Sequence, residues 1–490
     1  MIPRVESWLA LVCCLAGCAL CGCSHAASSE PSVSAGGPTT QDGGQSDAAA
    51  RPTGPVRGAS PVWPPAELEV AVPYRAGDVL ALLRMAANPG QLDLQMNIDT
   101  TSSMSKEIDA LQSELRGSLV PMLAARVDHA SFGVSSFEDF PVPPFGADTD
   151  HAFRLLSPIT DDVSAVENAV AKLDQPLGGG GDNDEAGSAA LYQIATGAGY
   201  TAAGTSLIER FAGPAASGGG TLGGVGFREH SLHVVLHATD ALAHTADDYA
   251  AGGLPDVHGM PDAIAALRAL PAQVIAIMST SCTDDACRQS DRYVQLRTQL
   301  SELALGTGAT MPPSSGQCPT GIGGASLPTY QNTCPLVFDV KSNGEGLAGT
   351  VIDSVIGLID GLRFSEVHAE VSADPLGFVQ DIEAQQVPQA KGAEAPRVED
   401  RLPARKPDGR PDTFVDVRQS SQLGFAVRLR NDRLAPSDLP QRFRVMLRIV
   451  GDGVVLQERT LRIVVPARNS DGDGGLAPDA AAVPADDAGR

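Results

Sequence analysis

Three features are scarce in this sequence: basic residues, aromatic residues and long apolar segments. The 35 Lys and Arg residues are outnumbered by 59 Asp and Glu residues, which gives a formal net charge of −24. This balance excludes a nucleic-acid binder, because such a protein needs a basic footprint to neutralise phosphate. Aromatic residues make up only 4% of the chain, but hydrophobic residues make up 43%. A sizeable core of Ala, Val, Leu and Ile can therefore form, and a wholly disordered or collagenous chain is excluded.

The N-terminal segment 1–23 has the pattern of an export signal. Arg4 supplies positive charge, and residues 8–17 form an apolar run that is too short for a comfortable membrane span. The run ends in Leu-Ala-Gly-Cys at Cys18, which resembles the bacterial lipobox, where the Cys is lipidated. The next residue is Ala19 rather than Asp, which by the same resemblance implies an outer-membrane lipoprotein. An ordinary cleaved signal peptide is the alternative. We expect no transmembrane helix, because no other segment has about 18 consecutive apolar residues.

Cysteine is scarce outside the signal region. Five of the nine cysteines lie at positions 13–23, and the other four are Cys282, Cys287, Cys318 and Cys334. An even set in an exported chain indicates disulfides. We expect the pairs Cys282–Cys287 and Cys318–Cys334, because these close the shortest loops. A zinc site made of all four is the rival interpretation, but the spacing contains no CxxC pair.

The composition divides the chain into flexible ends and two folded parts. Residues 24–64 and the acidic tail 468–490 are rich in small and polar residues, which is typical of tethers. Between them, residues 65–362 alternate strand and helix patterns, which predicts an α/β domain with a doubly wound, Rossmann-like sheet. The expected strands are 92–98, 131–137, 152–156, 232–236, 274–278 and 336–340. The expected helices are 108–123, 163–173, 185–196, 264–270, 293–305 and 346–362.

Residues 363–467 change to a period of two, which predicts a small antiparallel β-sandwich. Phe443, Val445, Leu447 and Ile449 alternate with mostly polar neighbours. The stretch 387–411, rich in proline and charge, is expected to be a long loop. Residues 68–72 also have a strand pattern; if this strand joins the sandwich, the α/β domain is an insertion in it.

Oxygen-bearing side chains follow the first expected α/β strand. Asp99, Thr101 and Ser103 stand at i, i+2 and i+4, where alternate residues of an extended loop can point the same way. Two further acidic loops follow other elements, one at 178–185 and one at Thr239-Asp240. Ligands gather at the carboxyl ends of strands in doubly wound sheets, and hard oxygen ligands suit Mg²⁺, or Ca²⁺ and Mn²⁺.

This set resembles the von Willebrand factor A domain and its metal-ion-dependent adhesion site. The family motif is Asp-x-Ser-x-Ser, and Asp99, Thr101 and Ser103 match it with Thr in place of the first Ser. Asp240 matches the Asp of the third loop. The resemblance implies that these four residues bind a divalent metal ion.

Within that family, the sequence is similar to the integrin beta I-like branch. The second loop there ends in Asp-x-Pro-Glu, and Asp182 and Glu185 fall on its acidic positions. The resemblance implies that Glu185 is the charged partner of the main ion. It also implies a second metal site formed by Asp139, Asp182 and Glu185.

Other interpretations of these residues stay open at this point. Asp99, Thr101 and Ser103 could instead form a turn or cap the following helix. The glycine run at 178–181 could bind phosphate, but three acids follow it and would repel an anion. A zinc enzyme would need several histidines to converge, and the candidates are His230, His233, His237 and His244.

The function that these patterns favour is metal-dependent protein binding or adhesion, displayed by a lipid-anchored exported protein. A partner would supply an acidic side chain to the ion. The alternatives are a metal-stabilised structural or assembly module of the cell envelope and, less favoured, a metallohydrolase. We expect no enzymatic activity, because the sequence has no HExxH, GxSxG or P-loop motif.

Overall fold

The computed structural model describes residues 67–114, 127, 129–174, 176–213, 215–401 and 409–468. The signal region with Cys18, the tether, the tail from residue 469 and the expected helical positions 115–123 lie outside these residues. The chain divides into two units, Met1–Pro61 and Val62–Arg490. All of the described residues belong to the second unit. Among the described residues, no helix is long and apolar enough to cross a membrane.

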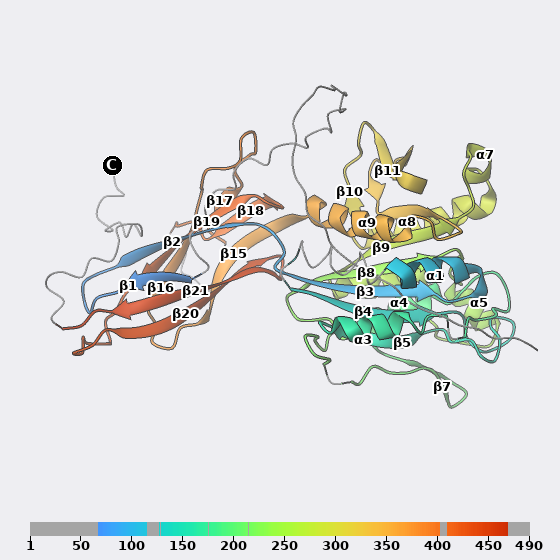
Figure 1. Ribbon diagram of the computed structural model, residues 1–490, viewed down its shortest axis with the longest axis horizontal. Coiled ribbons are helices and arrows are strands. Elements are labelled where there is room, and N and C mark those ends of the chain that lie inside the picture. The colour runs from blue at the N-terminus through green and yellow to red at the C-terminus, as the bar shows by residue number, and fades with distance from the viewer. Residues whose placement is uncertain are drawn as a thin grey trace, which may run out of the picture. The chain divides into compact units, whose positions relative to one another are not determined.

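A six-stranded sheet forms the centre of the α/β part (Figure 1). Its five neighbouring strands from β14 to β4 are parallel, and the edge strand β5 is antiparallel to β4. Strand β8 is buried along its whole length and β3 along nearly all of its length, as expected of central parallel strands. In spatial order, the strands are β14 (Val337–Lys341), β9 (Ala272–Thr280), β8 (Leu232–Thr239), β3 (Gln91–Asp99), β4 (His129–Phe137) and β5 (Arg154–Thr160).

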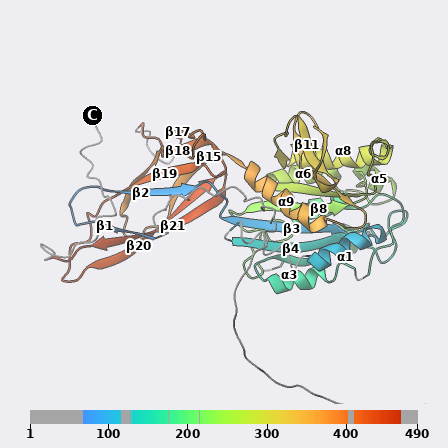
Figure 2. The ribbon, with the colours of Figure 1, turned by 45° about the horizontal axis from the view of Figure 1, so that its top comes forward.

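Two sets of helices pack around this sheet. Helix α1 contacts both α3 and α9, and Figure 2 shows these three following one another across the strands. Helix α6 contacts both α4 and α8. The bounds are α1 (Ser105–Glu114), α3 (Val163–Val170), α9 (Leu347–Gly361), α4 (Gly187–Thr196), α6 (Met260–Ala269) and α8 (Asp291–Gly306). The described part is thus a mixed α/β fold in which strands and helices alternate as the sequence predicts.

Two further sheets contain the C-terminal strands. The larger one is mostly antiparallel, with the order β1 (Glu67–Ala71), β21 (Val454–Val465), β20 (Gln441–Gly451), β15 (Arg363–Ala373), β18 (Thr413–Arg418) and β17 (Arg397–Glu399). The smaller one contains β16 (Val379–Gln385), β19 (Gln422–Leu429) and β2 (Val79–Ala86). Along β20, Val445, Leu447 and Ile449 are buried, which agrees with the period of two.

The N-terminal strands correct the expected domain boundary. We assigned residues 65–362 to the α/β domain. However, β1 pairs with β21, which agrees with the alternative in which strand 68–72 joins the C-terminal strands, and β2 pairs with β19. The α/β sheet therefore begins with β3, and the α/β part is inserted between β2 and β15. A smaller correction concerns the expected loop 387–411, in which β17 pairs with β18.

Short elements extend the edges of the α/β part. They are α5 (Ala246–Ala251), α7 (Asp285–Arg288), the hairpin β6 (Tyr200–Ala202) and β7 (Thr205–Ile208), the pair β10 (Thr310–Met311) and β13 (Cys334–Pro335), and the hairpin β11 (Gln317–Gly321) and β12 (Ala325–Pro328). The structure contains both expected disulfides, Cys282–Cys287 and Cys318–Cys334.

Candidate metal centre

The predicted ligand residues meet at the carboxyl ends of two neighbouring parallel strands. Asp99 is the last residue of β3, and Asp240 follows the last residue of β8. The Thr101 hydroxyl donates to Asp99 Oδ1 over 2.7 Å and lies 3.1 Å from Ser103 Oγ. Ser103 Oγ donates in turn to Asp240 Oδ1 over 3.1 Å. These close oxygen contacts bring all four side chains together, although 137 positions separate Ser103 from Asp240.

Asp99 is held from both sides by hydroxyl groups. Its Oδ2 accepts a hydrogen bond of 2.7 Å from Thr239, a residue that sequence reasoning cited only as the neighbour of Asp240. Its Oδ1 also accepts a hydrogen bond of 3.0 Å from the Thr101 backbone N–H. This local bond is the one expected if Asp99 were a turn residue. Thr101 precedes the short 3₁₀ turn Ser102–Met104, but its side chain makes no capping bond. The Thr101 hydroxyl therefore donates to the Asp99 carboxylate and does not cap the following helix.

The second loop, the glycine-rich segment 178–185, is hydrogen-bonded to the first loop, which follows Asp99. Gly178 N–H donates to Thr100 O, and Ser102 N–H donates to Gly178 O. A Cβ on Gly178 would come within 2.4 Å of Glu138 Cγ, so this close approach requires glycine. The buried Asp150 accepts from the backbone N–H groups of Gly179 and Gly180 over 2.9 and 3.0 Å. Sequence reasoning missed Asp150, because a lone aspartate in a loop carries no motif.

Glu185 joins the second loop to the third. Its backbone N–H donates to Leu242 O over 2.8 Å, and its carbonyl accepts from His244 N over 3.1 Å. The side chain is only 6% exposed, and Oε2 is buried without a hydrogen-bond partner among the described residues. A buried carboxylate oxygen without a partner is costly, and a cation is the kind of group that relieves it.

The electrostatics of this edge favour a cation. Burial, and then the nearby carboxylates of Asp99, Asp139, Asp150 and Asp182, raise the pKa of Glu185 to about 10. Burial and the charge of Asp240 raise the pKa of Asp99 to about 7. Carboxylates that disfavour one another's ionised forms ionise readily beside a positive ion. The donors present, carboxylates and hydroxyls, fit Mg²⁺, Ca²⁺ or Mn²⁺.

A second group of donors differs from the expected one. We expected Asp139, Asp182 and Glu185, but the donor atoms that lie within 4.8 Å of one another belong to Asp139, Asp182 and His244. His244 Nε2 is 3.0 Å from Asp139 Oδ2 and 3.2 Å from Asp182 Oδ1. Burial alone would lower the pKa of His244, but its contacts with these aspartates raise it overall. This Asp–Asp–His group could hold a metal ion, in competition with a proton on the imidazole.

The other histidines are placed apart from one another. His233 contacts the backbone carbonyls of Leu270 and Arg228 through its two ring nitrogens. His237 lies 3.0 Å from the side chain of Asn97, and burial lowers its pKa to about 4. His230 contacts Gly453 O. The four histidines of the zinc interpretation therefore do not form one ligand set.

No family model matches this chain, and no curated protein matches it either. Similar solved structures include a von Willebrand factor type A protein from Catenulispora acidiphila, with 13% identity, a TM-score of 0.32, and coverage of 82% of this chain and 72% of that one.

The pilus adhesin SpaC from Lactobacillus rhamnosus GG, in its open conformation, has 11% identity, a TM-score of 0.31, and coverage of 80% of this chain and 45% of that one. Proximal thread matrix protein 1 from the mussel byssus has 12% identity, a TM-score of 0.29, and coverage of 56% and 48%. This chain thus spans less than half of the length of these two proteins. At these identities and TM-scores the similarity carries no conclusion about this chain, and its function has to be inferred from the residues of the site.

Proposed function

We propose that this chain is a metal-dependent protein-binding module with the doubly wound fold of the von Willebrand factor A domain. The observation that carries the proposal is the convergence of oxygen atoms from Asp99, Thr101, Ser103 and Asp240, in successive contacts of 2.7–3.1 Å, at one edge of the sheet. Glu185 Oε2, which has no hydrogen-bond partner in the part of the chain that the structure describes, supports it. In this proposal the chain is a binding protein rather than an enzyme.

The residues of the site have distinct parts in the proposal. Asp99, Thr101, Ser103 and Asp240 would hold Mg²⁺, Ca²⁺ or Mn²⁺, with Glu185 as a charged neighbour. The ion supplies positive charge at the protein surface, where it attracts the carboxylate of a partner protein. Thr239 orients Asp99 through its 2.7 Å hydrogen bond. Asp150 fixes the second loop, so little ordering remains to be done when the ion binds.

Two serines in one turn provide a matched test. Ser103 donates to Asp240 and contacts the Thr101 hydroxyl, whereas its exposed neighbour Ser102 makes no side-chain bond to these described residues. The chain would be used to capture proteins from cell-surface fractions in Mg²⁺ or in EDTA. We expect a partner that is retained in Mg²⁺, retained by Ser102→Ala, and lost both in EDTA and with Ser103→Ala. Retention that is unchanged in EDTA and in Ser103→Ala contradicts the proposal.

A structural or assembly role is the second candidate, in which the ion only stabilises the loops. The mutual effects of the Asp99, Asp240 and Glu185 carboxylates favour it, because an ion would remove their repulsion. Thermal unfolding separates the two roles. If Mg²⁺ raises the melting temperature and the captured partner's acidic peptide raises it further, binding is supported. If the peptide adds nothing, the structural role is favoured.

For its location, we propose an outer-membrane lipoprotein anchored through Cys18, on either the periplasmic or the surface side. The support is the Leu-Ala-Gly-Cys sequence that ends at Cys18, followed by Ala19. Metabolic labelling with palmitate tests this proposal. We expect label on the wild-type chain and none on Cys18→Ser; equal labelling of the two chains contradicts the assignment.

A further inference from the structure

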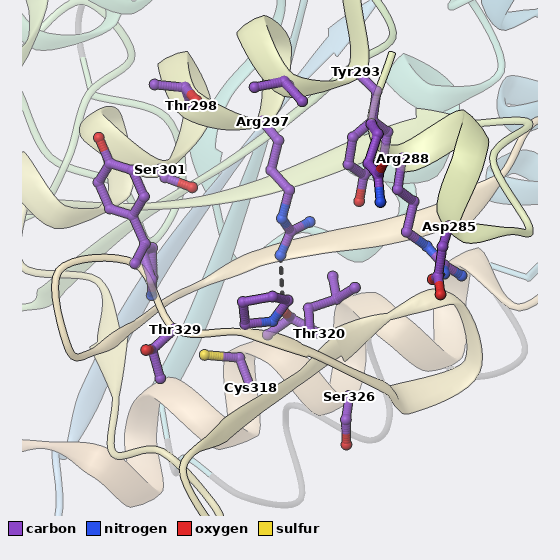
Figure 3. Close-up of a pocket in the computed structure, with 16 residues that line it drawn as sticks. Asp285, Arg288, Tyr293, Arg297, Thr298, Ser301, Cys318, Thr320, Ser326 and Thr329 are labelled. Atoms are coloured by element: carbon purple, nitrogen blue, oxygen red, sulfur yellow. Dashed lines mark hydrogen bonds and ion pairs between the residues drawn. The ribbon is translucent and has the colours of Figure 1, made fainter. Parts of the chain in front are cut away.

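A cleft of about 490 Å³ lies between helix α8 and the β11–β12 hairpin. Figure 3 shows Arg297 extending from α8 towards Thr320 on the facing strand, with Arg288 and Asp285 of α7 at one end. Its volume falls in the range of about 300–1,000 Å³ that is typical of small-molecule sites. None of the residues that line the cleft belongs to the candidate metal centre.

The walls of the cleft are held in place by covalent and polar contacts. The disulfide Cys318–Cys334 ties β11 to β13, and Cys282–Cys287 closes the turn that leads into α7. Arg297 forms an ion pair with the buried Asp339, and it donates to Thr320 Oγ1 over 2.9 Å and to Val337 O over 3.2 Å. These contacts fix both walls before any ligand arrives, which lowers the ordering cost of binding.

One part of the lining is apolar and open to solvent. Val294 of α8 is 48% exposed, although it is a large hydrophobic residue. Leu327 and Pro328 of β12 line the same cleft, together with the ring of Tyr293. The Tyr293 hydroxyl donates to Asp339 Oδ2 over 2.6 Å, so its polar end is already occupied and its ring remains for apolar contact. This lining suits an aromatic or branched aliphatic group.

The other part of the lining is charged. Arg297 is already paired with the buried Asp339, which leaves Arg288 as the guanidinium for which a ligand can compete. The charged residues of the lining are two arginines and one aspartate, Asp285. Asp285 is 91% exposed, and it pairs with Arg288 over 2.9 Å. Solvent weakens a pair of this kind, so a ligand carboxylate can compete for the guanidinium. Arg288 Nη2 donates to Thr283 O over 3.2 Å, which orients the guanidinium. A ligand carboxylate would take the place of Asp285 on Nη1.

We propose that this cleft binds an organic carboxylate whose body is aromatic or branched aliphatic. Arg288 attracts the carboxylate, and Val294, Leu327 and Pro328 cover the body. Both free small acids and the C-terminal residue of a peptide have this chemistry. The proposal is independent of the metal centre, because it requires no ion.

Binding is measured by calorimetry on the full chain in EDTA, so that a carboxylate cannot bind through a metal ion. The probes are N-acetyl-phenylalanine, its neutral amide with the same body, and acetate, which lacks the body. We expect the acid to bind about tenfold more tightly than the amide, and acetate not to bind measurably. The tripeptide Ala-Ala-Phe identifies the source. Tighter binding than the single acid assigns the cleft to peptide C-termini, and equal or weaker binding assigns it to small acids; both results support the proposal.

Matched variants locate the binding. Val294→Glu places a carboxylate in the cleft and should weaken acid binding by about tenfold or more. Its control Val163→Glu, at a valine of α3 that is 40% exposed, should bind as wild type does. Arg288→Gln should abolish the preference for the acid over the amide, and the exposed Arg268→Gln of α6 should keep it. The proposal is overturned if the acid binds no better than the amide, or if Val294→Glu binds the acid as wild type does.

Discussion

The protonation of Asp99 and Glu185 predicts that metal binding releases protons. Burial and neighbouring carboxylates raise the pKa of Glu185 to about 10 and that of Asp99 to about 7. In the metal-free protein at pH 7, Glu185 is therefore protonated and Asp99 is about half protonated. A divalent ion favours the ionised form of both groups. Binding should then release about 1.5 protons for each ion at pH 7.

The same protons set the pH dependence of metal affinity. A proton on either carboxyl group competes with the ion, so affinity must rise with pH. Between pH 7 and pH 8, weaker competition from the proton at Glu185 raises the metal affinity about tenfold, and weaker competition at Asp99 raises it about twofold. The dissociation constant should therefore fall by about 20-fold over this interval.

Calorimetric titration with Mg²⁺ or Mn²⁺ measures both quantities. Repeating it in buffers of different ionisation enthalpy gives the number of protons released. Glu185→Gln should lower that number by about one, whereas Glu209→Gln, at an exposed glutamate, should leave it unchanged. A release near zero at pH 7, together with an affinity that is the same at pH 7 and pH 8, would show that Asp99 and Glu185 do not lose protons to the ion.

Three further predictions concern single residues and the second disulfide. Ser103→Ala should weaken Mg²⁺ binding by about tenfold or more, because it removes a ligand hydroxyl, and calorimetry should find Ser102→Ala unchanged. In EDTA, the free energy of unfolding should fall by about 2–3 kcal/mol between pH 5 and pH 8 from Asp99 alone. The folded protein binds the Asp99 proton more tightly than the unfolded chain does, so stability is lost as pH rises through the folded pKa of about 7. A denaturant titration that finds higher stability at pH 8 than at pH 5 would contradict this prediction. Replacing Cys318 and Cys334 by serine, which opens a loop of 16 residues, should lower the unfolding free energy by about 3 kcal/mol in the same assay.

The sequence predicted the metal centre best where an apolar run marks the end of a strand and the parallel sheet brings such strand ends together. An apolar run ending at Asp99 and another ending just before Asp240 predict two strand ends, and parallel neighbours bring such ends to one edge. The helix expected from residue 185 begins instead at Gly187, because the Glu185 backbone forms a bridge with Ala243. Local helix propensity cannot reveal a bridge to a distant loop.

Long-range contacts account for the other differences. β2 pairs with β19 across more than 300 positions, and nothing in the two sequences specifies that partner. His244 joins Asp139 and Asp182 only because the third loop folds back onto the second. The family resemblance identified the two acidic residues of this group, but it could not identify the nearby side chain that completes it.

The most direct measurement is a crystal structure of the chain grown with Mn²⁺, with anomalous scattering used to locate the ion. Our account predicts a peak within coordination distance of Asp99, Ser103 and Asp240, which is absent from crystals of Asp99→Ala. No peak at this edge of the sheet, or a peak only among Asp139, Asp182 and His244, would contradict the assignment of the primary metal centre.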